Sequence, residues 1–214
     1  MYEAEQRSRA HYQKRARLYD WANRLAALLR GSSQMRERRE SVARLAVQPG
    51  ARVLEVSVGT GTNAPLILQR LGDSGCFVGV DISRAMLKRC QDKVTARGLD
   101  ALLVEGEAAH LPFADESFDA VFHHGGFAEF GDKQGAVDQM IRVARSGARI
   151  VICDVGVPHD RKLPLPSKLL LRLQPEYDQP PPINLMPASA GDLEPSWSGA
   201  WYAIEFVKPQ STST

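Results

Sequence analysis

Two apolar runs that each lead to a carboxylate constrain the fold of this chain most. The first, in the segment VLEVSVGTG, reaches Glu55 and opens into a turn with Gly59 and Gly61, and the second ends at Asp81. Such runs are typical of buried parallel strands, and glycines let the backbone turn tightly and approach a ligand. Asp81 would lie at the tip of the neighbouring strand, where a carboxylate can accept hydrogen bonds from both ribose hydroxyls. The sequence therefore predicts a ligand that contains a ribose.

Two classes of ligand fit this turn. The segment from Gly59 to Ala64 matches the dinucleotide pattern G-x-G-x-x-G/A, which leaves NAD as an alternative. Glu55 stands before the turn, where a carboxylate would repel a pyrophosphate but can help to hold an amino group. Each position also has a purely structural interpretation: the glycines can serve a strand-to-helix turn, and Asp81 can cap a helix that begins at Ser83. The ordered set, with its strand-and-helix spacing, favours a cofactor site.

Two later segments narrow the choice. They read GEAAHLPF from Gly106 and SFDAVF from Ser117. With the glycine turn and Asp81, they resemble the class I S-adenosylmethionine-dependent methyltransferases, most closely the ubiquinone/menaquinone biosynthesis (type 11) branch. The resemblance runs from about Val53 to Asp154. It implies methyl transfer from S-adenosyl-L-methionine to a small-molecule acceptor.

The resemblance also implies a set of cofactor contacts. The residue matching Glu55 organises the methionine end, Asp81 holds the ribose, and Glu107 takes the place of the acid that contacts the adenine amino group. Ser57 departs from the family pattern, which has a glycine there, so its backbone must manage without the freedom of glycine. The cofactor-binding residues implied are Tyr19, Glu55, Ser57, Gly59, Gly61, Asp81, Ile82, Met86, Glu107, Ala108 and His123.

The acceptor side is expected after the fourth strand, where the sequence reads HHGGFAEF. Methyl transfer needs alignment of a nucleophile, exclusion of water and, for some acceptors, removal of a proton. His123 and His124 are the candidate catalytic bases because imidazole titrates near neutral pH. The alternative is that His123 only presents its backbone to the cofactor and that His124 forms a pocket wall. Tyr12, His124 and Phe127 are the candidate substrate contacts, and no metal-ligand spacing is found.

The alternation of apolar runs and helical segments predicts an α/β fold: a Rossmann-like, doubly wound, mainly parallel sheet with an antiparallel final strand and N-terminal helices. We expect one methyltransferase domain over residues 1–214, with an N-terminal helical lid (1–47), a cofactor-binding core (48–157), a proline-rich cover (158–200) and a final strand (201–207). Ile183 to Met186 is the best candidate for the penultimate strand. The expected strands are 52–56, 76–80, 101–105, 119–123, 148–154 and 201–207, and the expected helices are 3–30, 33–47, 64–71, 83–97 and 133–145.

Composition agrees with one globular enzyme domain. The chain has 214 residues, 43% of them hydrophobic, and a net charge of +2 that gives no reason to expect a nucleic-acid partner. Three unpatterned cysteines fit a reducing cytoplasm, and no apolar run approaches membrane-spanning length. The chain is therefore expected to be a cytoplasmic enzyme. A NAD-dependent oxidoreductase and a non-catalytic S-adenosylmethionine-binding protein are the alternatives, and the oligomeric state is left open.

Overall fold

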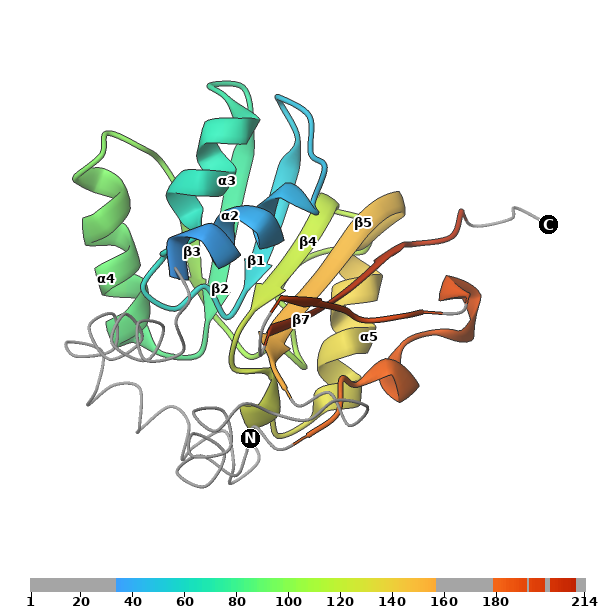
Figure 1. Cartoon of the computed structure of the whole chain (residues 1–214). Coiled ribbons are helices and arrows are strands. Elements are labelled where there is room, and N and C mark those ends of the chain that lie inside the picture. The colour runs from blue at the N-terminus through green and yellow to red at the C-terminus, as the bar shows by residue number, and fades with distance from the viewer. Residues whose placement is uncertain (1–33, 157–178, 192, 199–200, 211–214) are drawn as a thin grey trace.

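The apolar runs of the sequence form the central strands of a seven-stranded sheet. The computed structural model describes residues 34–156, 179–191, 193–198 and 201–210 (Figure 1). The strand order is β3-β2-β1-β4-β5-β7-β6, with β1 to β5 parallel and β7 antiparallel to both of its neighbours. The strands are β1 (Arg52–Val56), β2 (Cys76–Asp81), β3 (Leu102–Glu105), β4 (Phe118–His124), β5 (Ala144–Val155), β6 (Ser196–Ser198) and β7 (Trp201–Val207).

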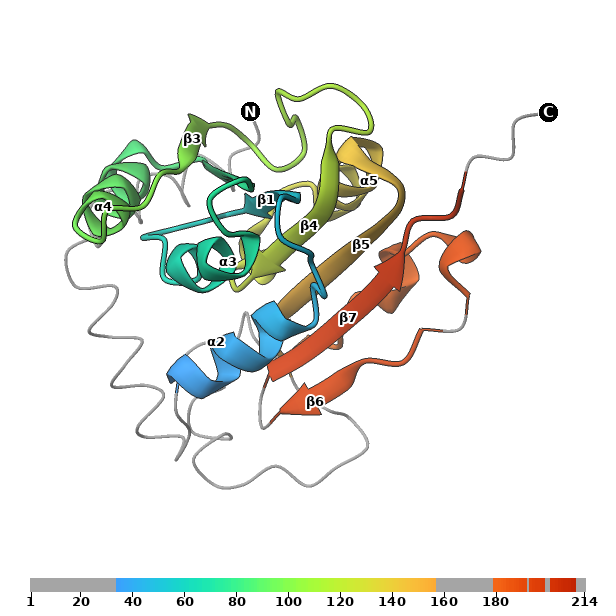
Figure 2. The ribbon, with the colours of Figure 1, turned by 90° about the horizontal axis from the view of Figure 1, so that it is seen from above.

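Helices cover both faces of the sheet, as Figure 2 shows. On one face, α2 (Gln34–Ala43), α3 (Ala64–Leu71) and α4 (Arg84–Thr95) pack on a cluster that includes Phe77 and Phe122. On the other face, α5 (Lys133–Val143) packs on a second cluster that includes Phe118 and Ile150. Alternate residues of the central strands contribute to the two clusters, because successive side chains of a strand point to opposite faces. This burial on both faces explains why these strands read as continuous apolar runs.

The predicted doubly wound sheet is confirmed, with small differences at the ends of elements. β1, α3 and β7 have the expected bounds, whereas α5 ends at Val143 and the chain passes directly into β5. The β4–β5 ladder is irregular at this entry, because Phe118 pairs with Ala144 while Ala120 pairs with Arg149. The expected helix at 3–30 lies outside the described residues.

The expected penultimate strand was placed wrongly. Residues Ile183–Leu185 form a 3-10 turn, η3, and a second 3-10 turn, η4, covers Ala188–Ala190. The strand is instead β6, where Trp197 pairs with Tyr202 of β7. Prolines surround Ile183 to Met186 and lack the N–H that a sheet ladder needs, whereas β6 directly precedes its antiparallel partner in the chain.

The described part of the proline-rich segment lies against α5. Gln134 of α5 donates from its side-chain amide to the Leu185 carbonyl at 3.2 Å, and Lys133 donates to the side chain of Gln179 at 3.0 Å. Ile183 and Leu185 pack against the core cluster on this face.

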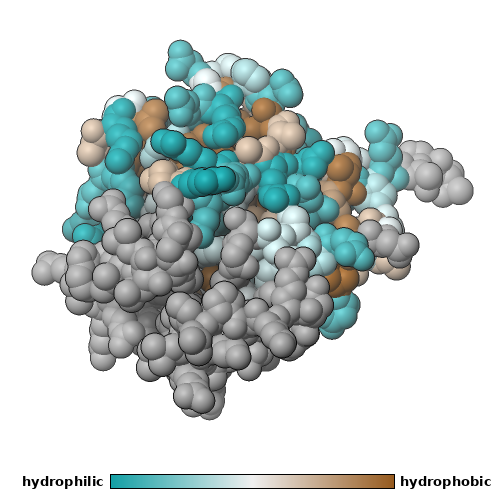
Figure 3. Space-filling model, in the orientation of Figure 1, coloured by the Kyte–Doolittle hydropathy of each residue, from teal (hydrophilic) through white to brown (hydrophobic). Residues whose placement is uncertain are grey.

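Hydrophilic residues predominate among the described residues on the face drawn in Figure 3, and hydrophobic ones occur in small groups. Among the described residues, the large hydrophobic side chains that are exposed are Met35, Leu102 and Val207, which lie on three different elements. None of the described helices is long and apolar enough to cross a membrane.

Candidate functional site

The glycine turn follows β1 at the point where the strand order reverses between β1 and β4, which is where open α/β sheets bind their ligands. Ser57, Gly59 and Gly61 all have positive φ angles, of 58°, 54° and 70°. The turn is tied to the next strand because the Val58 amide donates to the Val80 carbonyl at 3.0 Å. The backbone at Ser57 thus adopts the left-handed conformation that glycine adopts without strain.

Gly61 has a packing role as well as a conformational one. A Cβ atom at this position would lie 2.3 Å from the Cys90 Sγ atom of α4. Glycine therefore lets the turn and α4 approach each other closely. Gly61 does not line the pocket described below, so its direct contact with the cofactor stays a prediction.

Asp81 closes the turn from the end of β2. Its carboxylate accepts hydrogen bonds from the Gly59 amide at 2.8 Å and from the Ser83 amide at 2.9 Å. Ser83 in turn is the N-cap of α4, where its hydroxyl accepts from the Met86 amide at 3.5 Å. The structural and the binding interpretations of Asp81 thus coexist, since each carboxylate oxygen has more than one lone pair. Burial raises the pKa of Asp81 to about 6, and the two backbone hydrogen bonds oppose this effect.

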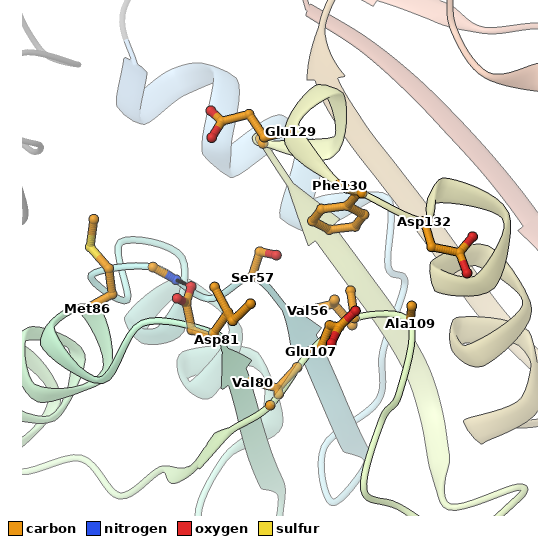
Figure 4. Close-up of a pocket in the computed structure, with 17 residues that line it drawn as sticks. Val56, Ser57, Val80, Asp81, Met86, Glu107, Ala109, Glu129, Phe130 and Asp132 are labelled. Atoms are coloured by element: carbon orange, nitrogen blue, oxygen red, sulfur yellow. Dashed lines mark hydrogen bonds between the residues drawn. The ribbon is translucent and has the colours of Figure 1, made fainter. Parts of the chain in front are cut away.

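A pocket that is partly open to solvent lies at this edge of the sheet (Figure 4), and its empty space, together with the open solvent at its mouth, amounts to about 750 Å³. Asp81 and Met86 form one side of it, and Phe130 and Asp132 lie across from them in the close-up. Seven of the predicted cofactor residues line it: Ser57, Gly59, Asp81, Ile82, Met86, Glu107 and Ala108. The other lining residues are Val56, Val80, Gly106, Ala109, Gly125, Gly126, Glu129, Phe130, Gly131 and Asp132.

The β3 side of the pocket carries Glu107 and Ala108. The Gly106 amide donates to the Asp81 carbonyl at 3.1 Å, which aligns this segment with the end of β2. Glu107 Oε1 lies 3.6 Å from Nδ1 of His110. The acid at the end of β2 and the acid just after β3 are thereby held at the rim of one pocket, as the sequence predicted.

Glu55 lies behind the glycine turn rather than on the pocket surface. Its Oε1 accepts from the Asn63 side-chain amide at 2.6 Å, and Asn63 Oδ1 accepts from Arg38 of α2 at 2.8 Å. Its second oxygen, Oε2, is buried and has no hydrogen-bond partner. Burial raises the pKa of Glu55 to about 7. A direct contact between Glu55 and a ligand therefore stays a prediction.

The two histidines of β4 point to opposite faces of the sheet. His123 is fully buried, its Nδ1 lies 3.0 Å from the Val56 carbonyl oxygen, and its ring contacts Phe127 and Phe130. Burial lowers the pKa of His123 to about 4. Its hydrogen bond joins β4 to β1, and its side chain does not line the described pocket, so its predicted roles as base and as cofactor contact stay predictions.

His124 is buried on the α2 face, where its ring lies 4.4 Å from the Trp201 ring, centroid to centroid. Burial and the nearby Arg38 charge lower its pKa well below the usual range. Its side chain does not line the described pocket, so its role toward an acceptor stays a prediction.

Phe127, a predicted acceptor contact, is a core residue with 2% exposure, and its contact with the acceptor stays a prediction. Its neighbour Phe130 lines the pocket instead, because the chain between them makes the 3-10 turn η1 (Phe127–Glu129) and turns Phe127 inward. Two consecutive glycines after an apolar strand were the sequence signal for this pocket wall, but they did not predict which side chains face the pocket. Tyr12 and Tyr19 lie outside the described residues.

Comparison with known proteins agrees with this geometry. Residues 53–147 match a family described as methyltransferase domain. A demethylmenaquinone methyltransferase of Mycobacterium sp. (strain KMS) is 37% identical over 68% of this chain and 58% of its own length. A ubiquinone/menaquinone biosynthesis C-methyltransferase of Xanthomonas campestris is 39% identical over 63% of this chain and 53% of its own length. The chain thus spans little more than half the length of these relatives.

The fold is matched by the solved structure of a putative S-adenosyl-L-methionine-dependent methyltransferase from Methanococcus maripaludis. The TM-score is 0.69 at 15% identity, over 94% of this chain and 95% of that chain. This chain has the class I methyltransferase fold. The match to the methyltransferase-domain family covers the segment that forms the glycine turn and the carboxylate rim.

Proposed function

We propose that this chain transfers a methyl group from S-adenosyl-L-methionine to a small-molecule acceptor. The observation that carries the proposal is the arrangement of Asp81 and Glu107 at the ends of adjacent strands, facing a pocket closed by the glycine turn. The pocket offers no cation that could bind a phosphate, since no lysine or arginine occurs among its described lining residues. This composition suits a cationic sulfonium ligand better than the pyrophosphate of NAD.

The residues present fit the parts of this cofactor. Asp81 would accept hydrogen bonds from the ribose hydroxyls, while Ile82 and Met86 would pack on the adenine. Glu107 and the adjacent backbone would meet the adenine amino group. The buried Glu55 Oε2, which has no hydrogen-bond partner, is an acceptor that an ammonium group could satisfy after a small shift of the turn.

The cofactor supplies an activated methyl group on a sulfonium, whose leaving group is a neutral thioether. The protein therefore has to align the acceptor and exclude water. Phe130 and the Gly125–Gly126 backbone form the wall that would do so. No base is assigned to His123, because its buried Nδ1 is engaged by the Val56 carbonyl and its pKa is lowered to about 4.

The proposal for the acceptor is less specific than the proposal for the cofactor. A relative that is 37% identical is named a demethylmenaquinone methyltransferase, so a demethylated quinone of that kind is the first acceptor to assay.

Calorimetry on the whole chain with S-adenosylmethionine, S-adenosylhomocysteine and NAD tests the proposal. The two sulfur ligands should bind and raise the melting temperature, whereas NAD should not. Asp81→Asn should lower the affinity for both by about tenfold, the loss expected for charge-assisted hydrogen bonds. Asp100→Asn, an exposed acid just before β3, is the matched control and should leave the affinity unchanged. Binding of NAD alone would refute the proposal.

A further inference from the structure

The wall of the pocket that follows β4 has an unusual backbone. Gly125 and Gly126 are consecutive residues with positive φ angles of 84° and 92°. They lead into η1, whose N-cap residue is Gly126 and therefore has no side chain that could cap the turn. This loop, residues 125–132, supplies Gly125, Gly126, Glu129, Phe130, Gly131 and Asp132 to the pocket lining.

The missing cap is supplied by a carboxylate from another strand. Asp154, at the end of β5, accepts from the Ala128 amide at 3.2 Å, from the Gly126 amide at 3.4 Å and from the Val155 amide at 2.7 Å. Amides at the start of a helical turn point outward with unsatisfied hydrogens, and a carboxylate is their strongest side-chain partner. The side chain thus joins the loop to the middle of the sheet.

Asp154 is buried, with 1% exposure, and does not itself line the pocket. Burial raises the pKa of Asp154 to about 6, against the effect of the amides that donate to it. A buried carboxylate is costly compared with an apolar residue of similar size. Its hydrogen bonds with the described residues are to backbone amides, and those of Gly126, Phe127 and Ala128 belong to the loop, so its interactions are directed at the shape of the wall.

We propose that Asp154 is a positioning residue that holds the 125–132 wall of the pocket in its binding conformation. It acts through the Gly126 and Ala128 amides, which set the direction of the segment that carries Glu129 and Phe130. The proposal rests on the proposed function only for the choice of S-adenosylhomocysteine as the binding probe.

The test compares Asp154→Asn with Asp119→Asn in the whole chain. Asp119 is a matched control because it also accepts from a backbone amide, that of Arg52 at 2.7 Å, but at the opposite end of the sheet. Hydrogen exchange of the Gly126 and Ala128 amides reports the loop, and calorimetry with S-adenosylhomocysteine reports the pocket. Melting temperatures of both variants separate loss of affinity from loss of overall stability.

In Asp154→Asn, we expect exchange at Gly126 and Ala128 to accelerate by about tenfold and the dissociation constant for S-adenosylhomocysteine to rise by about fivefold, as for loss of a hydrogen bond to a charged group. Asp119→Asn should accelerate exchange at Arg52 and leave the loop and the affinity unchanged. Unchanged exchange in Asp154→Asn would overturn the proposal. So would faster exchange with unchanged affinity, because the loop would then not shape the pocket.

Two further outcomes remain decisive. If the wild-type chain does not bind S-adenosylhomocysteine, the proposed function fails, and the exchange rates alone decide whether Asp154 holds the loop. If Asp154→Asn does not fold, hydrogen exchange of the Gly126 and Ala128 amides in the wild-type chain decides. Protection of Gly126 and Ala128 by about a hundredfold over a free peptide supports the proposal, and exchange near the free-peptide rate overturns it.

Discussion

Three buried carboxylates lie at or near the carboxyl ends of parallel strands: Glu55 on β1, Asp81 on β2 and Asp154 on β5. Burial raises the pKa of each above its usual range. Groups with such shifts often gather at functional sites, because a fold that needs only stability would replace them with apolar residues. At the scale of single residues, these three carboxylates therefore lower the stability of the fold, one of them in the pocket lining and two outside it.

Glu55→Gln should make the ligand-free protein more stable at alkaline pH. The folded-state pKa of Glu55, about 7, lies above the ordinary value of 4.5, so the folded state binds the extra proton between these values. Stability therefore falls as the pH rises through this window. Glutamine does not ionise, so the variant does not lose stability in this window, and its side-chain oxygen can still accept from Asn63. Urea unfolding should show a gain on the order of 2–3 kcal/mol near pH 8.

The same comparison below about pH 4.5 should show almost no difference between wild type and Glu55→Gln, because the carboxyl group is then protonated in both states. Glu194→Gln, at an exposed position, is the control and should behave alike at both pH values. A Glu55→Gln gain that does not depend on pH would contradict the assigned cause.

Ser57→Gly should stabilise the protein, although it removes a side chain. Ser57 has a φ of 58°, a conformation that costs a non-glycine residue about 1–2 kcal/mol, whereas the added backbone entropy of glycine costs about 0.5–1 kcal/mol. The expected gain in unfolding free energy is about 0.5 kcal/mol or somewhat more. Ser57→Val should destabilise, because a branched side chain tolerates this φ poorly. If Ser57→Gly destabilises the protein, the Ser57 side chain makes a contact that contributes more stability than the relief of backbone strain provides.

At the scale of elements, Gly61 sets how closely the glycine turn packs against α4. Gly61→Ala combines a φ of 70° with a Cβ 2.3 Å from Cys90 Sγ. Gly98→Ala has a similar φ, 65°, with no atom within 4 Å of the new Cβ. Gly98→Ala, the control, should lower the free energy of unfolding by about 1–2 kcal/mol through backbone strain. Gly61→Ala should lower it by roughly a further 1–3 kcal/mol through overpacking.

Thermal or urea unfolding of the two alanine variants measures this difference. Adding Cys90→Ala to Gly61→Ala should recover part of the loss, because Sγ is removed while the Cys90 Cβ remains 3.1 Å away. Equal losses for Gly61→Ala and Gly98→Ala would mean that α4 moves aside easily and does not define the turn.

Elements with a strong local signal were predictable from the sequence. β1 and α3 were placed correctly because an apolar run, a glycine turn and an amphipathic stretch follow one another. β6 was not, because three residues carry no period, and its position depends on pairing with β7. The β5 start was also missed, since an irregular ladder with β4 begins where the helix ends.

At the scale of the whole molecule, the sequence located the site through the ends of its strands. Asp81 and Glu107 meet at one pocket because parallel strands bring their carboxyl ends together. The sequence did not predict the direction of the side chains in the loop after β4, where η1 turns Phe127 into the core and leaves Phe130 at the pocket. Asp154 was missed for a related reason, because its partners are loop amides distant in the sequence.

The pocket as a whole should distinguish its ligands by charge. Asp81, Glu107, Glu129 and Asp132 line it, and its described lining contains no lysine, arginine or histidine. S-adenosylmethionine carries one more positive charge than S-adenosylhomocysteine, so the summed field should favour it, and salt should screen that preference. The ratio of the two affinities should therefore move toward the neutral product as salt is added.

Calorimetry near pH 8, where Asp81 is ionised, measures this ratio. Raising the salt from about 0.05 M to about 0.5 M should reduce the preference for S-adenosylmethionine by roughly twofold to threefold. Glu129→Gln should weaken both the preference at low salt and its salt dependence. Asp138→Asn, an exposed acid of α5 outside the pocket lining, is the control and should behave like wild type. A ratio that does not change with salt in the wild-type protein would show that the pocket carboxylates are neutralised when the ligand binds, and that contacts other than the summed charge decide between substrate and product.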